Sequence, residues 1–263
     1  MTGATTVLVG AVVSGAVAFA ARARGSLSTS GAWAALGVGT AVFAGGGGGW
    51  FAVLGWFFVT STLLGRVGAA RKEAVKREFE KGDTRDAWQV LANGGVAAAA
   101  ALAMAAAPSA RWAAAFVAAL ATANADTWAT ELGVLSRGEP WSLVRFARVP
   151  RGTSGAVSPL GMAAAFAGAL TVATVAAWSI APVARTIVLG AALGTLGALV
   201  DSLLGATVQA RFHCARCGRD AESEVHHCGA TCTLRGGLRA FNNDAVNAGA
   251  TLVAAIAAAL VAG

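Results

Sequence analysis

The chain has 263 residues, of which 56% are hydrophobic and only 13% charged, and its mean hydropathy is +0.64. A soluble domain carries about 25% charged residues, so this composition excludes an ordinary soluble fold and indicates a membrane protein. The formal net charge is +7, but no nucleic-acid-binding motif accompanies it, so we expect no nucleic-acid partner.

Apolar segments predict an all-α fold, a polytopic bundle of about eight transmembrane helices. A helix needs about 20 mostly apolar residues to cross a bilayer. The predicted spans are 5–21, 30–44, 50–65, 88–107, 111–126, 159–179, 185–208 and 243–262. They form a single transmembrane domain over 1–263, with a short cytoplasmic Cys/His insertion at 209–240.

Five glycines, Gly45 to Gly49, separate the second and third spans. A phosphate-binding P-loop needs a Lys and then a Ser or Thr after its glycines, and neither follows here. We therefore expect a tight turn between two helices.

The basic residues predict the orientation of the chain. If the N-terminus lies outside, the inner loops are 22–29, 66–87, 127–158 and 209–242, and they hold 18 of the 20 Lys and Arg residues. Only Arg111 and Arg185 fall elsewhere. Because loops rich in Lys and Arg stay in the cytoplasm, we expect a multi-pass cell-membrane protein whose polar motifs face the cytoplasm.

The loop at 66–86 mixes seven basic with five acidic residues. This mixture favours a solvated helix lying on anionic lipid. In the apolar span that follows, Asn93-Gly94-Gly95 permits close approach of the backbone to a polar group. Asn93 is therefore a candidate phosphate ligand.

Two carboxylates, Asp126 and Glu131, follow the apolar run of the fifth span. They are five residues apart, or about 140° around an ideal helix, so they share one site only if the helix loosens or each meets a different ligand. We expect them to bind Mg²⁺, which takes one or two carboxylates and completes its shell with phosphate oxygens and water. The alternative is a solvated helix end.

The segment RVPRGTSGAVSPLG combines basic, hydroxyl and small residues. Ser158 followed by Pro159 predicts a helix start, because serine caps free amides and proline fits the first turn. Amides at this start and the residues ahead of it would form a cradle for phosphate; an ordinary flexible loop is the alternative. The candidate anion ligands are Arg148, Arg151, Thr153, Ser154 and Gly155.

The seventh span carries an aspartate on a face of small residues. Spacings of three and four place that face on one side of a helix, and its members are Gly190, Gly194, Gly197, Asp201, Gly205 and Gln209. An aspartate in a membrane helix is costly and by default functional, so we expect Asp201 to bind Mg²⁺. The alternative is a packing face with one interhelical hydrogen bond.

All four cysteines lie between Cys214 and Cys232, with His226 and His227 among them. Thiols stay reduced in the cytoplasm, and four thiolates suit a closed tetrahedral Zn²⁺ site, which argues against a catalytic zinc. We expect a structural zinc; a redox or disulfide role, or no joint role, is the alternative. The expected ligands are Cys214, Cys217, Cys228 and Cys232.

The last span begins with polar residues: Asn243 and Asn247 are one turn apart, and Asp244 lies beside them. We expect the two amides to bind phosphate oxygens. Several acidic residues at one membrane face need cations, so we group Asp244 with the other carboxylates around Mg²⁺.

Six segments carry a resemblance to a known family. They are KREFEKGDTRDAWQVLANGG, ANADTWATELGVLS, RVPRGTSGAVSPLG, LVDSLLGATVQ, the Cys/His segment and NNDAVN, in this order over about residues 60 to 250. Together they resemble the integral membrane family that includes plant phytyl-phosphate kinase, many bacterial and archaeal members, and an animal transmembrane member of unsettled function. That family is distantly similar to membrane enzymes that use CTP, such as dolichol kinases and cytidylyltransferases.

The resemblance implies a Mg²⁺-dependent phosphotransferase that uses CTP or ATP. Its partners would be a nucleoside triphosphate and a membrane lipid substrate, a prenyl monophosphate of the phytyl or geranylgeranyl kind. The matched positions are Asn93, Asp126, Glu131, Arg151, Ser154, Asp201, Asn243 and Asp244. Among them, Asp126, Glu131, Asp201 and Asp244 are the expected catalytic residues.

Two other functions are weighed against the kinase. Cytidylyl transfer, which makes a CDP-activated lipid, differs only in the phosphorus that is attacked, so the sequence leaves it open. A lipid-phosphate transporter or flippase would show polar groups at mid-membrane depth and an inverted repeat. The sequence shows neither feature, so we expect an enzyme.

Overall fold

Long apolar segments of this chain form helices, because in lipid every backbone N–H and C=O must find a partner within the protein. The computed structural model describes residues 3–68, 84–151, 153–180, 184–221, 223–226 and 228–263. Most of the basic loop expected at 66–86 lies outside the described residues. The helices are α1 (Gly3–Ala23), α2 (Thr29–Arg66), α4 (Ala87–Ala106), α5 (Ala110–Gly133), α6 (Pro159–Ser179), α7 (Ala184–Thr207) and α8 (Asn243–Ala262).

Six helices within the described residues are long and apolar enough to cross a membrane: α1, α2, α4, α6, α7 and α8. α5 is not one of them, because Arg111 at its start and Asn124 and Asp126 in its second half interrupt its apolar run. Protein encloses it instead, and its eleven residues from Ala115 to Ala125 are all buried. α5 also continues to Gly133, beyond the expected end at 126, so both of its carboxylates lie on the helix.

α2 folds back on itself at Gly47, whose φ of 75° and ψ of −166° are not helical. A straight helix of its length would extend about 57 Å, yet Ser26, in the link just before α2, and Arg66, at its last residue, line the same cleft. Phe43 and Phe51 meet edge to face across the fold-back, with 5.8 Å between ring centroids. The expected spans 30–44 and 50–65 are thus two arms of α2, and the expected glycine turn joins them.

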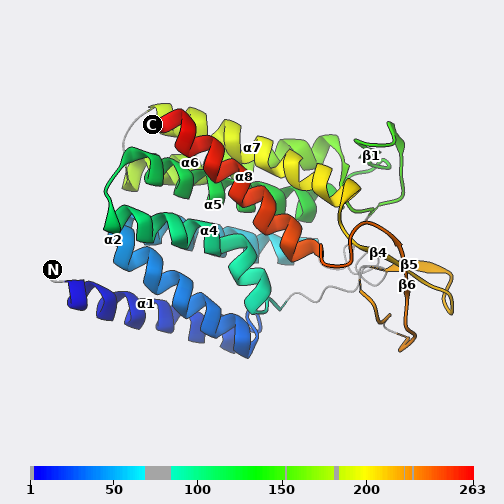
Figure 1. Cartoon of the computed structure of the whole chain (residues 1–263), viewed down its shortest axis with the longest axis horizontal. Helices are drawn as coiled ribbons and strands as arrows, with labels where there is room; N and C mark the ends of the chain where they lie inside the picture. Colours follow the sequence, from blue (N-terminus) through cyan, green and yellow to red (C-terminus); the bar gives the residue numbers. More distant parts are fainter. Residues whose placement is uncertain (1–2, 69–83, 152, 181–183, 222, 227) are drawn as a thin grey trace.

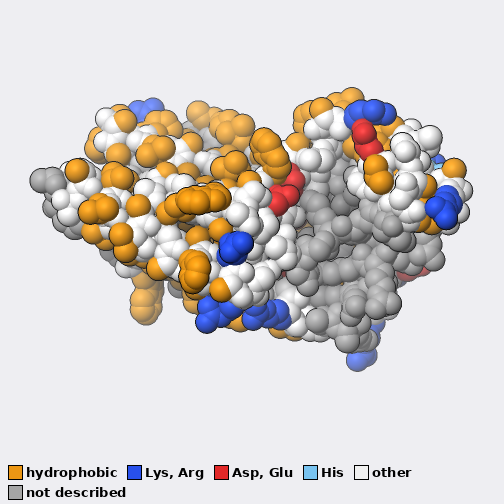
Figure 2. All heavy atoms as spheres, turned by 90° about the horizontal axis from the view of Figure 1, so that it is seen from below, with side chains coloured by type: hydrophobic (Ala, Val, Ile, Leu, Met, Phe, Trp, Pro, Cys, Tyr) orange, Lys and Arg blue, Asp and Glu red, His pale blue; other side chains and the backbone are white. Residues whose placement is uncertain are grey.

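Figure 1 shows the helices side by side along the long axis, with the β-strands at one end and both termini at the other. We call the first the strand end. In Figure 2, hydrophobic side chains cover the helical part, and most of the visible charged side chains lie towards the strand end. At the opposite end Arg185 Nη2 donates to the carbonyl of Val261 at 2.7 Å. The charge asymmetry expected from the sequence is therefore a property of the two ends of the bundle.

Two small antiparallel sheets form at the strand end, where the sequence analysis expected only loops. In the first, β1 (Trp141–Ser142) pairs with β2 (Ala147–Arg148) and β3 (Ala156–Val157). In the second, β4 (Arg211–Cys214) pairs with β5 (Arg219–Ala221) and β6 (Thr233–Gly236). Strands of two to four residues are too short to leave an alternating pattern in the sequence, and they form because the loop backbone needs partners.

The four helices that begin at the strand end are all capped by a side chain. Ser28, Asp86, Ser158 and Asn242 each accept a hydrogen bond from an amide in the first turn of α2, α4, α6 and α8. Such caps satisfy amides that the helix leaves without a partner. The start of α6 at Ser158-Pro159, expected from the sequence, is confirmed.

The small residues of α7 allow it to lie close to α5 and α6. A Cβ at Gly194 would lie 2.6 Å from that of Ala121 and 2.9 Å from that of Ala169, and one at Gly197 would collide with Thr122. Small residues let helix backbones approach in this way in membranes. This close packing brings Asp201, one turn beyond Gly197, beside the end of α5.

Candidate functional site

A cleft of about 540 Å³ opens at the strand end, where helices from all parts of the chain end or begin. Its lining comes from the ends of α2, α5 and α7, from the starts of α4, α6 and α8, from the link after α1 and from the loop between α5 and α6. Among the described residues, four arginines and three acidic residues line it: Arg24, Arg66, Arg85 and Arg151, with Asp126, Glu131 and Asp201. A concave site with both signs of charge suits a polyanion bound together with a cation.

The cleft brings together eight of the residues that the sequence analysis selected. They are Asp126, Glu131, Arg151, Thr153, Ser154, Gly155, Asp201 and Asn243. Within the described residues, Asn93, Arg148, Asp244 and Asn247 do not line it. Asn93 lines a second pocket, Arg148 is exposed on β2, and the other two are half-buried near the start of α8.

Asp126 and Glu131 both line the cleft although α5 remains helical to Gly133. The sequence analysis required the helix to loosen, or each carboxylate to meet a different ligand. Neither condition follows from the geometry, because the cleft extends around the end of a central helix. Two carboxylates on different sides of α5 can therefore face one ligand volume.

Arg85 is the cleft residue that the sequence analysis missed most plainly. Its amide donates to the carbonyl of Ser26 at 3.1 Å, and its carbonyl accepts from the amide of Ser28 at 3.0 Å. Its guanidinium lies 5.8 Å from the ring centroid of Phe58. Burial lowers the pKa of Arg85 and the charge of Glu131 raises it, but arginine keeps its charge in proteins. The chain therefore holds a fixed cation beside the carboxylates.

Arg24 and Arg66 were also missed. Each lies at the end of a different helical segment, and nothing in its local sequence distinguishes it from other boundary residues. They can be recognised only once the helix ends are known to meet, because both belong to the end at which the basic residues gather.

The loop before α6 rests on the end of α7. Ser154 Oγ donates to Gln209 Oε1 at 2.7 Å. Gly155 has a φ of +71°, and a side chain there would collide with the backbone of Ser202 and Ala206. Arg151 Nη2 donates to a carbonyl at 2.7 Å, that of Arg137. These contacts hold a loop that could otherwise be flexible.

The amides of this loop are largely used within the protein. The amide of Thr153 donates to Pro150 O, that of Ala156 to Thr153 O, and that of Gly161 to Ser158 Oγ. The expected cradle of backbone amides is therefore partly closed. A phosphate in the cleft would be bound chiefly by the arginine side chains, which offer several donors each.

Asn124 forms a polar layer beneath the cleft. It is fully buried; its Nδ2 donates to Gly168 O at 2.8 Å, and its Oδ1 accepts from Thr60 Oγ1 at 3.1 Å and Ser61 Oγ at 3.4 Å. These bonds join α2, α5 and α6. Asn124 does not line the cleft itself, but Ser61, which donates to it, does. Because a buried amide is stabilised when its hydrogen bonds are satisfied, Asn124 supports this side of the cleft.

A second, smaller pocket of about 90 Å³ adjoins the cleft. It lies between α1, both arms of α2 and α4, and most of its lining side chains are apolar. Arg85, Gln89 and Thr127 line both spaces. Polar and apolar binding volumes thus meet at these three residues.

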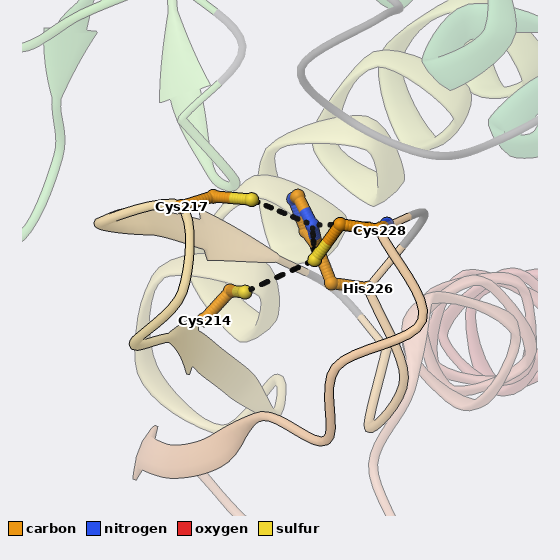
Figure 3. Close-up of side chains that lie close together, drawn as sticks. All are labelled: Cys214, Cys217, His226 and Cys228. Carbon is orange, nitrogen blue, oxygen red and sulfur yellow. Dashed lines mark hydrogen bonds between the residues drawn. The ribbon is translucent and has the colours of Figure 1, made fainter.

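Cys214, Cys217, His226 and Cys228 form a cluster whose ligand atoms all lie within 4.8 Å of one another. Figure 3 shows the three sulfurs turned towards one another, with the imidazole of His226 beside those of Cys217 and Cys228. Sγ of Cys214 lies 3.7 Å from that of Cys228, and His226 Nδ1 lies 3.5 Å from Cys217 Sγ and 3.2 Å from Cys228 Sγ. In tetrahedral zinc sites such pairs lie about 3.8 Å (S–S) and 3.5 Å (S–N) apart. The residues fit such a metal.

His226 stands in this cluster where the sequence analysis expected Cys232. A turn explains the exchange: the amide of His226 donates to Ala230 O and that of Gly229 to His226 O, which returns the imidazole towards Cys228. Cys232 lies beyond this turn, and its amide donates to Glu224 O at 2.7 Å. Counting cysteines alone could not reveal this turn.

The thiols of the cluster influence each other's ionisation. A hydrogen bond with Cys228, loss of hydration and the neighbouring Cys214 raise the pKa of Cys217 to about 11. Loss of hydration opposes ionisation of Cys214, but hydrogen bonds from the Cys217 amide and from Cys228 outweigh it, and its pKa is lowered. A metal binds cysteine as the thiolate, so a bound cation would favour ionisation of these thiols.

The sheet that carries this cluster is joined directly to α7 and α8. The amide of Ala210 donates to Phe241 O at 2.7 Å, and that of Leu238 donates to Val208 O at 2.9 Å. Within the sheet, His213 Nδ1 lies 2.9 Å from Asp220 Oδ1, and this bond holds the pKa of Asp220 below its usual value. The insertion therefore closes on the helix ends that carry Asp201 and Asn243.

Comparison with known proteins places this chain among integral membrane proteins. Protein PGR of Arabidopsis thaliana is 35% identical over 231 residues, which cover 78% of this chain and 79% of that protein. An uncharacterised membrane protein of Methanocaldococcus jannaschii is 32% identical over 151 residues (57% of this chain, 61% of that protein). One of Synechocystis is 33% identical over 172 residues (62% and 64%).

No solved structure matches the chain significantly. A family match covers most of it: residues 12–255 match the family described as integral membrane protein DUF92. Together with the plant relative, this match confirms the resemblance to an integral membrane family with plant members. The chain belongs to the integral membrane protein family DUF92.

Proposed function

We propose that this protein is a Mg²⁺-dependent kinase that adds a phosphate from a nucleoside triphosphate to a prenyl monophosphate. The observation that carries the proposal is the cleft, in which four arginines and three carboxylates meet at one end of an apolar bundle. Two anionic substrates need cationic partners, and a lipid substrate needs them beside apolar helices. By the positive-inside rule we assign the cleft to the cytoplasmic face of the cell membrane.

The chemistry requires little from the protein beyond placement and charge. An oxygen of the prenyl monophosphate attacks the γ-phosphorus, the bond from that phosphorus to the β–γ bridging oxygen breaks, and a nucleoside diphosphate leaves. The acceptor is already an anion, so no strong general base is needed. Asp126, Glu131 and Asp201 would hold Mg²⁺, which would neutralise the charge that develops on the transferred phosphate.

The arginines have a separate role in this proposal. Arg85 and Arg151 are anchored through backbone or side-chain bonds, so they can hold phosphate oxygens in place while the γ-phosphorus is transferred. Fixed cations that stabilise charge in the transition state cost no reorganisation when the reaction occurs.

The test uses purified protein in lipid nanodiscs with Mg²⁺, geranylgeranyl monophosphate, and CTP or ATP labelled on the γ-phosphorus. We expect label in a prenyl diphosphate. Glu131→Gln should lower the rate at least about 100-fold, the usual effect of losing one well-placed charged group. Glu139→Gln, an exposed residue of the next loop, is the matched control and should keep the rate.

Other outcomes separate the alternatives. Transfer of label from the α-phosphorus of CTP, with release of pyrophosphate, would establish cytidylyl transfer instead. Failure to transfer either label to any prenyl monophosphate, together with movement of the lipid across liposomes, would favour a transporter.

A structural zinc bound by Cys214, Cys217, His226 and Cys228 completes the proposal. The distances within the cluster support it. The metal would hold β4 to the loop that leads into β6, and so stabilise the connection between α7 and α8.

A further inference from the structure

The pocket that adjoins the cleft is too small for a nucleotide and is lined mainly by apolar side chains, among them Leu27, Val38, Leu54, Phe58 and Val90. A cavity of about 150 Å³ takes one benzene ring, so about 90 Å³ has room for about four carbon atoms. This is close to one five-carbon isoprene unit.

The position of the pocket identifies its occupant. Arg85 and Gln89 line both the pocket and the cleft, so a group in the pocket continues directly into a space lined by cations. Val17 of α1 also lines the pocket, and it is 44% exposed. A molecule with a phosphate, a short branched apolar segment and a long tail would occupy the cleft, the pocket and the bilayer in turn.

We infer that this pocket between α1, both arms of α2 and α4 binds the first isoprene unit of a prenyl monophosphate. The inference rests on the proposed function for the identity of the head group. The remaining units of the prenyl chain pass α1 and enter the bilayer, where the protein discriminates only weakly between chain lengths. Recognition would therefore depend on branching near the phosphate.

Gly55 offers a way to fill the pocket without disturbing the fold. It lines the pocket, and a Cβ there would meet no atom within 4 Å. Gly37 of the other arm also has open space around it, but it is exposed and lines neither the pocket nor the cleft. Because glycine is a poor helix former, leucine at either position should preserve the helix. Gly37→Leu is therefore the matched control for Gly55→Leu.

The test measures binding without turnover. A geranylgeranyl monophosphate that carries a photoreactive diazirine in its first isoprene unit is cross-linked to the protein in nanodiscs, with no nucleotide present. We expect wild-type and Gly37→Leu to be labelled equally on α1, α2 or α4. Labelling of Gly55→Leu should fall at least about tenfold, since even one methylene in an apolar pocket changes recognition by that factor. Melting temperatures of both variants show that the fold is kept.

Competitors test the assignment to an isoprenoid phosphate. Unlabelled geranylgeranyl monophosphate should remove the labelling, whereas phosphatidylcholine and straight-chain hexadecyl monophosphate should not. Equal competition by phosphatidylcholine would make the pocket a general lipid cavity and overturn the inference. Unchanged labelling of Gly55→Leu would overturn it too. Specific labelling without phosphate transfer would refute the proposed kinase activity but support the pocket as the binding site of the isoprene unit. Phosphate transfer with unchanged labelling of Gly55→Leu would support the kinase activity and refute this role of the pocket.

Discussion

Gly155 offers a measurable test of how the arginine-bearing loop is held on α7. Its φ of +71° is unfavourable for other residues, and a side chain would also collide with the backbone of Ser202 and Ala206. The left-handed conformation costs alanine about 1–2 kcal/mol, and overpacking costs about 1–3 kcal/mol more. Gly155→Ala should therefore destabilise the protein by about 2–5 kcal/mol.

Gly47→Ala separates these two costs. Gly47 has a φ of +75° but no atom within 4 Å of a Cβ, and it lies at the fold-back of α2, away from the cleft. Its φ of 75° and ψ of −166° lie in a region that essentially only glycine adopts, so a conformational cost of about 1–3 kcal/mol applies there without a steric cost. In a melting assay in detergent, Gly155→Ala should lose its fold at a lower temperature than Gly47→Ala.

Activity provides the second measurement. Displacing the loop moves Arg151 and Ser154 away from the other cleft residues, and misplacement by about 1 Å can cost about 100-fold in rate. Gly155→Ala should thus lose transfer activity at temperatures at which it remains folded, whereas Gly47→Ala keeps it. If both variants melt at the same temperature and both transfer phosphate at the wild-type rate, the position of the loop does not depend on its contact with α7. The proposed arrangement of the site would then be wrong.

Three further predictions concern magnesium, zinc and the orientation in the membrane. Mg²⁺ and nucleotide together should raise the melting temperature far more than either alone, because both bind the native state. Asp126→Ala should abolish this joint effect, whereas in Arg151→Ala the effect of nucleotide should still depend on Mg²⁺. Metal analysis should find one zinc per chain, lost in His226→Ala but kept in Cys232→Ser; a zinc-free wild type contradicts the centre. All four cysteines lie at the strand end. After zinc chelation, a maleimide that cannot cross membranes should therefore label them in inside-out vesicles and not in right-side-out vesicles. The opposite pattern would place the cleft on the outer side of the membrane.

Apolar length and charge made much of the fold predictable. The described bounds of α1, α4, α6, α7 and α8 differ from the expected spans by at most two residues. A helix that crosses the lipid bilayer must be long and apolar, so the length of each apolar segment directly indicates where its helix begins and ends. The five glycines mark the fold-back of α2 for a similar reason, since no other residue adopts the φ of Gly47 at low cost.

α5 and the small sheets were less predictable because protein, not lipid, surrounds them. A helix enclosed by other helices can carry Asn124 and two carboxylates without meeting the bilayer, so apolar length ceases to mark its end. The strands at the strand end contain two to four residues each, and their pairing depends on the positions of the helix ends that they connect. Pairing that depends on tertiary structure in this way leaves no periodic pattern in the sequence.

The candidate site was predictable only in part for the same reason. Carboxylates such as Asp201 are conspicuous in an apolar segment, so the sequence exposes them. Arg24, Arg66 and Arg85 are ordinary members of basic loops, and only the convergence of helix ends selects them. His226, and not Cys232, joins the other three cysteines in the Cys/His cluster, because a turn and not the spacing decides which side chain faces the sulfurs.

The cleft and the pocket bring a polar and an apolar volume together inside the protein. Arg85 and Gln89 lie where the polar volume meets the apolar one, and Arg85 is held there by backbone bonds to the link between α1 and α2. A phosphate on a lipid tail satisfies both sides only at that level, because a deeper position would bury its charge among apolar side chains and a shallower one would expose its tail to water. The fixed depth of Arg85 therefore sets the depth at which the proposed acceptor meets the carboxylates of α5 and α7.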